Sequence, residues 1–280
     1  MSEKRIMLRI PSAPKSIKKG FPLKLILDRE AVDQLGRNLT FVYDEFNTQG
    51  FVNSAMEGIS ELGIKDRGVH IARAMKEFLP KDYLESLDMI LKSLTPPLEK
   101  TKDNGLAGLF YMPHNSFISE YGLAYFEESM AAMYQLTTRF TCEYPIRPFI
   151  VKNESRALEI LNEWMLDENP HIRRLCSEGT RSRLPWATKI DSFVKDPSPV
   201  LHILELLKDD SDLYVRRSVA NHVGDIAKDH LDLAMNLCET WLGTESSPAS
   251  KELKWVIRHA VRNPVKKGVA KAIELRVAAK

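Results

Sequence analysis

A short segment concentrates the side chains that are best suited to bind an anion. Residues 171–187, HIRRLCSEGTRSRLPWA, hold four arginines within eleven positions, with a single carboxylate, Glu178, among them. A guanidinium presents its N–H donors in a fixed fork that matches the oxygens of a phosphate. Four arginines so close together exceed what solubility requires, so the segment predicts a surface for a phosphate-bearing partner.

The arginine pair at the start of this segment recurs at a fixed distance along the chain. Residues 159–182 align with residues 202–225 at an offset of 43 positions, and a weaker third copy covers 238–263. A period of this length with two helices per copy is typical of HEAT-type repeats, which stack into a solenoid with a concave surface. We therefore predict an all-α fold, a HEAT-like repeat solenoid of stacked antiparallel helix pairs. Its second helices would line a concave DNA-binding groove with arginines.

The first half of the chain is also expected to be helical. Apolar residues at spacings of three and four predict helices in four stretches. They are 23–46, 51–80 with a break between Gly63 and Gly68, 81–94, and 117–140 with a break near Gly122. Alternating β-branched residues are missing, so strands should be few or absent.

Other stretches are predicted to be irregular. Glycine and proline punctuate residues 101–116, which predicts a loop. Residues 1–20 contain several lysines and prolines, which predicts a flexible basic arm. We expect the rest, 21–280, to form a single HEAT-like repeat domain.

Bulk composition limits the classes of protein. The hydrophobic share of 44% suffices for a folded core, and a net charge of +2 means that any polyanion must bind to a local patch. The three cysteines lie far apart and show no metal-ligand spacing, so we expect no disulfide framework, no metal and no cofactor, and a cytoplasmic setting. No apolar run is long enough to span a membrane and no convincing signal peptide is present. We expect a monomer that does not contact membranes.

A structural role competes with phosphate binding at each arginine pair. An arginine on the second helix of a HEAT unit often forms an ion pair with an aspartate of the preceding turn, and Asp167 and Asp210 are available. A structural brace explains one member of each pair as well as phosphate binding does. Residues 252–280 carry eight Lys or Arg against two Glu, which fits a DNA contact or a solvated charged helix equally well.

Three ordered motifs carry a family resemblance. They are HIRRLCSEGTRSRLPWA at 171–187, TCEYPIRPFI at 141–150 and YVRRSVANHVGDIAKDH at 214–230. They resemble the motifs of the AlkC-type DNA alkylation-repair glycosylases, which run approximately as HVRRLxSEGxRPRLPW, SEFAIRPF and YVRRSVANxLxDIxKxxP. The resemblance extends from about residue 21 to 270. Ser182 stands where the family usually has proline, and Pro145 where it usually has alanine.

The resemblance implies a fold and an activity. It implies a HEAT-like solenoid that hydrolyses the N-glycosidic bond of alkylated bases in duplex DNA and leaves an abasic site. The bases would be 3-methyladenine and also 3-methylcytosine. The resemblance implies that neither a metal nor a nucleotide is needed, and that the base is not drawn into a tight pocket.

Such a reaction needs specific side chains. A cationic alkylated base is already a good leaving group, so the enzyme needs a carboxylate beside the deoxyribose, where an oxocarbenium ion develops, and a positioned water. Aromatic faces can attract the cationic lesion. The candidate catalytic residues are Glu120, Glu143, Glu178, Tyr121 and Trp186.

Each candidate acid has a structural alternative. Glu143 lies four residues before Arg147, which fits a salt bridge on one helix face. Glu178 could instead orient a neighbouring arginine. Glu120 has the fewest basic neighbours in sequence, which favours a catalytic role. Trp186 follows a proline at the end of a helix, so we expect it to be exposed.

The candidate DNA-binding residues follow the arginine pattern. They are Arg147, Arg173, Arg174, Arg181, Arg183, Arg216, Arg217, Asn221 and Lys228. HEAT solenoids are more often interaction scaffolds than enzymes, so a non-catalytic nucleic-acid or protein binding module is the alternative. A module that bound DNA through phosphates alone would need the arginines and no carboxylate.

Overall fold

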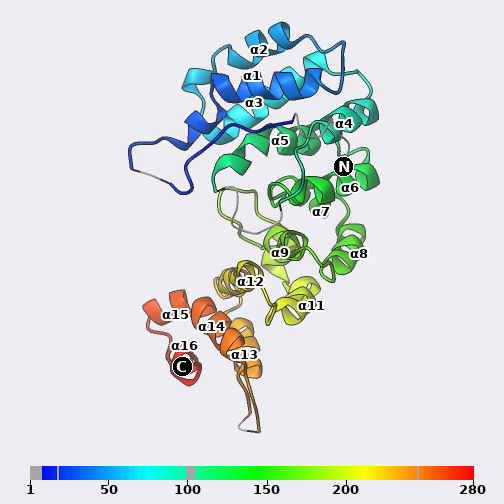
Figure 1. Ribbon diagram of the computed structural model, residues 1–280. Coiled ribbons are helices and arrows are strands. Elements are labelled where there is room, and N and C mark those ends of the chain that lie inside the picture. The colour runs from blue at the N-terminus through cyan, green and yellow to red at the C-terminus, as the bar shows by residue number, and fades with distance from the viewer. Residues whose placement is uncertain (1–7, 18, 99–104, 245) are drawn as a thin grey trace. The chain divides into compact units, whose positions relative to one another are not determined.

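Helices dominate the structure, as the periodicity predicts. The computed structural model describes residues 8–17, 19–98, 105–244 and 246–280, and its contacts divide the chain into two compact units, Met1–Lys152 and Asn153–Lys280 (Figure 1). The only sheet in the described residues is one short hairpin. The expected all-α fold is therefore confirmed. No helix among these residues is long and apolar enough to cross a membrane.

The first unit is built of helices of ordinary length with short 3-10 turns between them. Asp28 caps the first α-helix by accepting a hydrogen bond from the Ala31 N–H at 3.2 Å, a usual N-cap arrangement. The elements are η2 (Leu23–Leu27), α1 (Arg29–Thr40), α2 (Thr48–Met56), η3 (Ile59–Glu61), α3 (Ile64–Phe78), α4 (Tyr83–Lys92), η4 (Ala107–Tyr111), α5 (Met112–Tyr121), α6 (Phe126–Thr137) and α7 (Ile146–Lys152).

The prediction of a loop over 101–116 is wrong for its second half. Residues 107–111 form η4, and α5 begins at Met112. Pro113 lies in the first turn of α5, where proline needs no hydrogen-bond acceptor and its fixed φ suits the helix. Residues 101–104 lie outside the described residues.

The described part of the expected basic arm packs against the rest of the first unit. Leu8 is buried, and the Asn38 amide donates to the carbonyl of Arg9 at 2.8 Å. The N–H of Leu106 donates to the carbonyl of Pro14 at 3.1 Å. Residues 1–7 and 18 lie outside the described residues. The single domain expected over 21–280 stays a prediction beside the two units found here.

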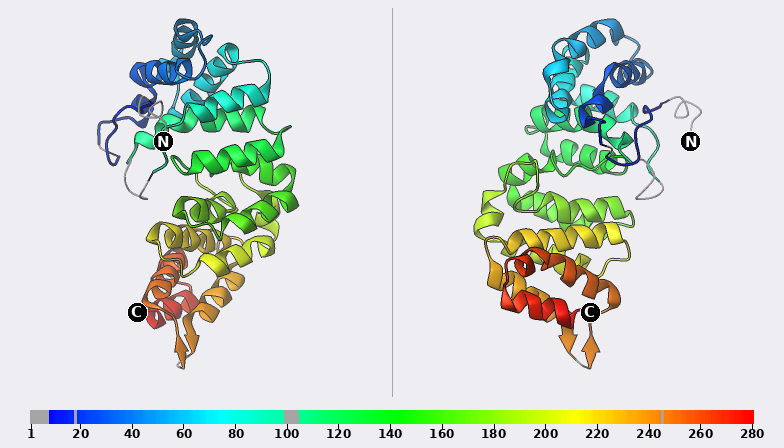
Figure 2. Two further views of the ribbon diagram at one scale, coloured as in Figure 1. Left: turned by 45° about the vertical axis from the view of Figure 1, so that its right-hand side comes forward. Right: turned by 90° about the vertical axis from the view of Figure 1, so that its left-hand side faces the viewer.

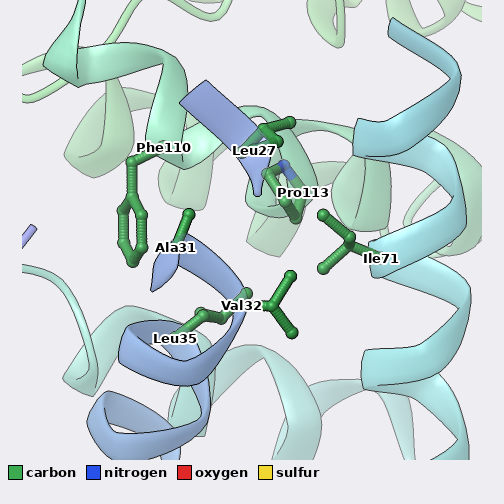
Figure 3. A pocket seen from close by; sticks show the side chains of 7 residues that line it. All are labelled: Leu27, Ala31, Val32, Leu35, Ile71, Phe110 and Pro113. Atoms are coloured by element: carbon green, nitrogen blue, oxygen red, sulfur yellow. The ribbon is translucent and has the colours of Figure 1, made fainter. Parts of the chain in front are cut away.

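Apolar side chains meet in the core of the first unit (Figure 3). Helix α3 packs between α2 and α5, and side chains of η2, α1 and η4 close the same core. The small gap that remains is lined by Leu27, Ala31, Val32, Leu35, Ile71, Phe110 and Pro113. This lining offers no polar side chain to a ligand, so we interpret the gap as core packing.

The second unit contains the three predicted repeats. Its helix pairs are α8 (Glu154–Trp164) with α9 (Pro170–Gly179), α11 (Ser198–Leu207) with α12 (Leu213–Ile226), and α13 (Leu231–Leu242) with α14 (Lys251–Ala260). The shorter helices are α10 (Asp191–Lys195), α15 (Arg262–Lys266) and α16 (Ala270–Ala278). The helix pairs fall on the three aligned segments, so the repeat prediction is confirmed.

The second helices of the three pairs lie side by side, because α12 packs against both α9 and α14 (Figure 1). Each begins at a side-chain cap. Asn169, Asp212 and Ser250 accept hydrogen bonds from backbone N–H groups at 2.9, 2.7 and 2.9 Å. Buried apolar residues such as Val215 and Val219 face the neighbouring helices, which leaves the polar flanks of α9, α12 and α14 for the site.

A two-stranded hairpin links α13 to α14 and extends beyond the helix ends (Figure 2). Strand β1 (Gly243–Thr244) pairs antiparallel with β2 (Ser247–Pro248). Gly243 has a φ of +73°, and a side chain there would collide with the carbonyl of Ser247, so glycine is required at this turn.

Candidate nucleic-acid interface

Arg173 forms an ion pair that links two consecutive repeats. Its guanidinium donates to both carboxylate oxygens of Asp210, at 2.6 and 2.9 Å, and to the carbonyls of Asp167 and Glu168 at 2.8 and 2.9 Å. These four hydrogen bonds all lie within the fold, and the side chain is 15% exposed. These contacts fit the structural brace that the sequence allowed as an alternative, and the predicted phosphate contact stays a prediction.

Glu178 is the centre of a buried ionic network at the end of α9. It is 5% exposed, and its Oε1 lies 3.3 Å from Arg174 and 2.6 Å from Arg181. Its Oε2 accepts a hydrogen bond from the Ser218 hydroxyl at 2.6 Å. Burial raises the pKa of Glu178, but the charges of the two arginines and the serine hydrogen bond outweigh it and hold the pKa below its usual value. The carboxylate is therefore ionised and engaged by three donors.

The network continues into the next repeat through Arg181. Its guanidinium bridges Glu178 and Asp225, with a distance of 2.6 Å to each carboxylate. Asp225 also accepts a hydrogen bond from Lys228 at 2.6 Å. Arg181 is 7% exposed and both of its acids are buried. Arg181 thus bridges two helices, and its predicted DNA contact stays a prediction.

Three more predicted arginines contact groups of the same unit. Arg183 holds Asp229 in a two-pronged ion pair at 2.5 and 2.7 Å, which fixes the segment after α9 to the end of α12. Arg216 donates to the carbonyl of Asp210. Arg174 contacts Glu178 and lies 5.0 Å from the ring centre of Tyr214, a cation–π contact.

The remaining polar candidates of this unit reach solvent. Arg217 and Lys228 are exposed, and Asn221 is half-buried on the same helix, α12. The Asn221 oxygen accepts hydrogen bonds from Arg262 at 2.9 Å and from the His259 ring at 3.2 Å. These side chains extend the face of α12 toward α14 and α15.

Trp186 is exposed, as the sequence predicts. It is 65% exposed and has a φ of +67°, a backbone conformation that few residues other than glycine adopt. The loop around it is anchored by the buried Leu184 and by a hydrogen bond from Ile190 to the carbonyl of Ser182 at 3.2 Å. The fold thus holds a large aromatic surface in solvent at a strained position, a pattern associated with functional sites.

The candidate acids of the first unit differ in their surroundings. Glu120, at the end of α5, is contacted by both prongs of Arg73 at 3.3 Å, so it has a basic partner that sequence proximity did not reveal. Glu143 accepts a hydrogen bond from the Thr141 hydroxyl at 2.6 Å. It lies in the turn before α7, which begins at Ile146, and the salt bridge to Arg147 stays a prediction.

Aromatic and cationic candidates in this unit are largely enclosed. Tyr121 is half-buried and makes an edge contact with Phe117 at 5.1 Å between ring centres. Burial raises the pKa of Tyr121, and the charge of Glu120 raises it further. Arg147 is only 1% exposed, and its predicted DNA contact stays a prediction.

Comparisons with known proteins identify the family of this chain. No family model matches the chain. The uncharacterized protein YhaZ of Bacillus subtilis (strain 168) is 37% identical over 254 residues, which make up 90% of this chain and 67% of that protein. The alkylpurine DNA glycosylase AlkC of Pseudomonas fluorescens, solved bound to DNA containing an abasic site analog, is 34% identical, with a TM-score of 0.81 over 91% of this chain and 67% of that chain.

The chain belongs to the AlkC family. The sequence resemblance is therefore confirmed, together with the helical repeat fold that it implies. Within this AlkC-family chain, the structure gathers Arg174, Glu178 and Arg181 into one network of the second unit. The acids Glu120 and Glu143 belong to the first unit, and each is described there by its own contacts.

Sequence reasoning missed some partners that this AlkC-family fold brings together. Asp229, Arg262 and His259 did not stand out by residue type alone. A usable signal exists, because the cross-repeat partners lie about one repeat period apart. Their separations are 37, 44 and 46 residues for the arginines at 173, 181 and 183. An acid found one period after an arginine indicates a brace.

Proposed function

We propose that this AlkC-family chain is a monofunctional DNA glycosylase. It excises cationic alkylated bases, 3-methyladenine and 3-methylcytosine, from duplex DNA by hydrolysing the N-glycosidic bond, and so starts base excision repair. The observation that carries the proposal is the likeness to Pseudomonas AlkC over 91% of the chain, in a structure bound to DNA with an abasic site analog. We further propose that the protein acts as a cytoplasmic monomer.

The chemistry requires one carboxylate to face the deoxyribose. As the cationic base departs, positive charge develops on the sugar, and a nearby carboxylate stabilises it and orients the attacking water. Glu178 already accepts from Arg174, Arg181 and Ser218, so its charge is neutralised inside the fold. We therefore assign it to positioning the arginines, and we propose Glu120 and Glu143 as the candidate catalytic acids.

The cations divide into two groups by their partners. Arg173, Arg181 and Arg183 each hold a carboxylate of the next repeat and keep the second helices in place. Exposed Arg217 and Lys228 are proposed to contact the phosphate backbone. Tyr121 and Trp186 are proposed to contact the damaged nucleotide, where an aromatic face attracts the cationic base.

The first experiment measures release of free base from methylated duplex DNA by chromatography, with and without a chelator. Release of 3-methyladenine that persists with chelator is the expected result. Duplex binding without release of any base would contradict the glycosylase proposal and favour a non-catalytic scaffold.

The second experiment assigns the acid. Glu120→Gln and Glu143→Gln are compared with Glu159→Gln, an exposed acid on α8 that pairs with Arg156. We expect at least one of the first two to lose base release while it keeps its affinity for duplex DNA. Full activity in both would remove them from the mechanism.

A further inference from the structure

In the described part of the second unit, Arg217 and Arg262 differ from the four arginines of residues 171–187 in lacking an acidic partner. Arg173, Arg174, Arg181 and Arg183 each contact a carboxylate at 3.3 Å or less. In the described part of the chain, neither Arg217 nor Arg262 forms an ion pair with one. A cation without a counter-charge inside the fold is available for an anion that binds from outside.

Arg262 is oriented entirely by neutral groups. One terminal nitrogen donates to the Asn221 side-chain oxygen at 2.9 Å and the other donates to the carbonyl of His259 at 2.6 Å. A guanidinium has five N–H donors, so donors remain for another acceptor. The half-buried side chain is thus fixed in place while its charge stays unneutralised.

His259 packs beside the contact between Asn221 and Arg262. Its ring stacks on Trp255 with centres 4.9 Å apart and planes 11° apart, and its Nε2 lies 3.2 Å from the Asn221 oxygen. Burial, followed by the charges of Arg262 and Arg217, lowers the pKa of His259 to about 4. Arg217 and Asn221 lie four residues apart on α12, one helical turn, and Asn221 contacts Arg262 at 2.9 Å, so the two arginines lie on one local surface.

Arg181 is a third cation near Arg262. Burial lowers the pKa of Arg262, and the charge of Arg181 lowers it further, against a smaller opposing effect of Asp225. Asp225 is already shared by Arg181 and Lys228. Positive charge is therefore in excess where α12 faces α14 and α15.

A glycine of α12 allows α14 to approach this helix closely. Gly224 of α12 faces α14, and a side chain there would come within 3.3 Å of the Ala260 carbonyl and 3.9 Å of the Arg262 guanidinium. The absence of a side chain at this position lets the end of α14 pack tightly on α12, which brings Arg262 to Asn221.

We propose that Arg217 and Arg262 together bind one phosphate of a DNA backbone, and that Asn221 is the positioning residue that holds Arg262 toward it. A phosphate supplies the missing negative charge and accepts several hydrogen bonds at once. The inference deepens the proposed function, on which it rests for the identity of the polyanion. It assigns Arg262 to binding and gives Arg217 a partner in the same site.

The test uses undamaged duplex DNA, so that it does not depend on base release. Arg217→Ala, Arg262→Ala and the double variant are compared with Arg156→Ala, whose arginine is ion-paired on α8. Affinity is measured against salt concentration. Loss of one phosphate contact should reduce the slope of log affinity against log salt by about 0.9. We expect this loss in the double variant, weaker binding in each single variant, and an unchanged slope for Arg156→Ala.

Coupling between the two arginines tests whether they share one phosphate. If they do, the double variant weakens binding by less than the product of the two single effects. Independent effects, or an unchanged slope with Arg262→Ala, would overturn the shared site. Arg262→Lys keeps the charge but not the fork, and we expect it to restore most of the slope. Thermal unfolding of each variant controls for misfolding.

The outcomes separate this site from the proposed function. Base release by the wild type together with an unchanged slope overturns the phosphate site and leaves the glycosylase. A reduced slope in a protein that releases no base supports the site and overturns the glycosylase. Displacement of the DNA by an acidic peptide, with no salt dependence specific to Arg262, would assign the surface to a protein partner and overturn the site.

Discussion

Glu178 and Arg181 lie three residues apart and form a buried ion pair at 2.6 Å, with both side chains less than a tenth exposed. The same arginine reaches Asp225 one repeat further along, and the same carboxylate reaches Ser218. The two charges are thus held by groups of consecutive repeats. Their first role is to fix α9 against α12.

The pair predicts a stability effect at Glu178. Glu178→Gln removes the negative charge while keeping the shape, which leaves Arg174 and Arg181 buried with less compensation. Breaking a buried pair costs about 3–5 kcal/mol, so we expect the free energy of unfolding to fall by about that amount, measured by urea titration. Glu159→Gln, at an exposed position of α8, is the control. A stability equal to that of the wild type would contradict a structural role.

The Arg173–Asp210 tie predicts a thermodynamic coupling rather than a DNA effect. In a double-mutant cycle with Arg173→Ala and Asp210→Ala, we expect a coupling energy of about 1–3 kcal/mol in unfolding. The salt dependence of DNA binding should not change in Arg173→Ala, because the guanidinium faces the fold. A flatter slope in a variant that still folds would return Arg173 to the DNA interface.

The exposed aromatic at the end of the arginine segment predicts a loss of activity without a loss of stability. Trp186→Ala should reduce base release roughly tenfold or more, since stacking on a base is worth about 1–3 kcal/mol. The melting temperature should stay the same, because the side chain is 65% exposed. Trp186→Phe should retain part of the activity. Unchanged release by Trp186→Ala would exclude a contact with the damaged nucleotide.

His114 predicts a pH dependence of stability. It is completely buried beside Phe110 and Tyr111, and burial lowers its pKa from 6.5 to about 3. Between these values the unfolded chain binds a proton that the folded chain does not, so this contribution is fully present above pH 6.5 and is lost as the pH falls toward 3. His114→Leu should make the stability less dependent on pH in this window. An identical dependence would assign the effect to other groups.

The helices and the repeats could be predicted because they depend on local patterns. The alignment of 159–182 with 202–225 predicts the pairs α8–α9 and α11–α12, since apolar residues must face a neighbour at helical spacing. The loop predicted at 101–116 failed in its second half because proline in the first turn of a helix carries the same local signal as proline in a loop.

The partners of the charged residues could not be predicted in the same way. Arg73 meets Glu120 across 47 positions, and Arg181 meets Asp225 across 44. Such pairs depend on how helices pack, which the sequence near each residue does not encode. Burial is equally non-local: Arg147 has the same residue type as exposed Arg217, yet it is almost completely enclosed.

The ion pairs between consecutive repeats affect how the second unit unfolds. In many repeat proteins each unit contributes its own stability and can fray separately from the ends. Here, opening the repeat of α11 and α12 would leave Arg173 and Arg181 without Asp210 and Asp225. Partial unfolding therefore carries an added electrostatic cost, and we infer that α9, α12 and α14 exchange their amide hydrogens as one cooperative block rather than repeat by repeat.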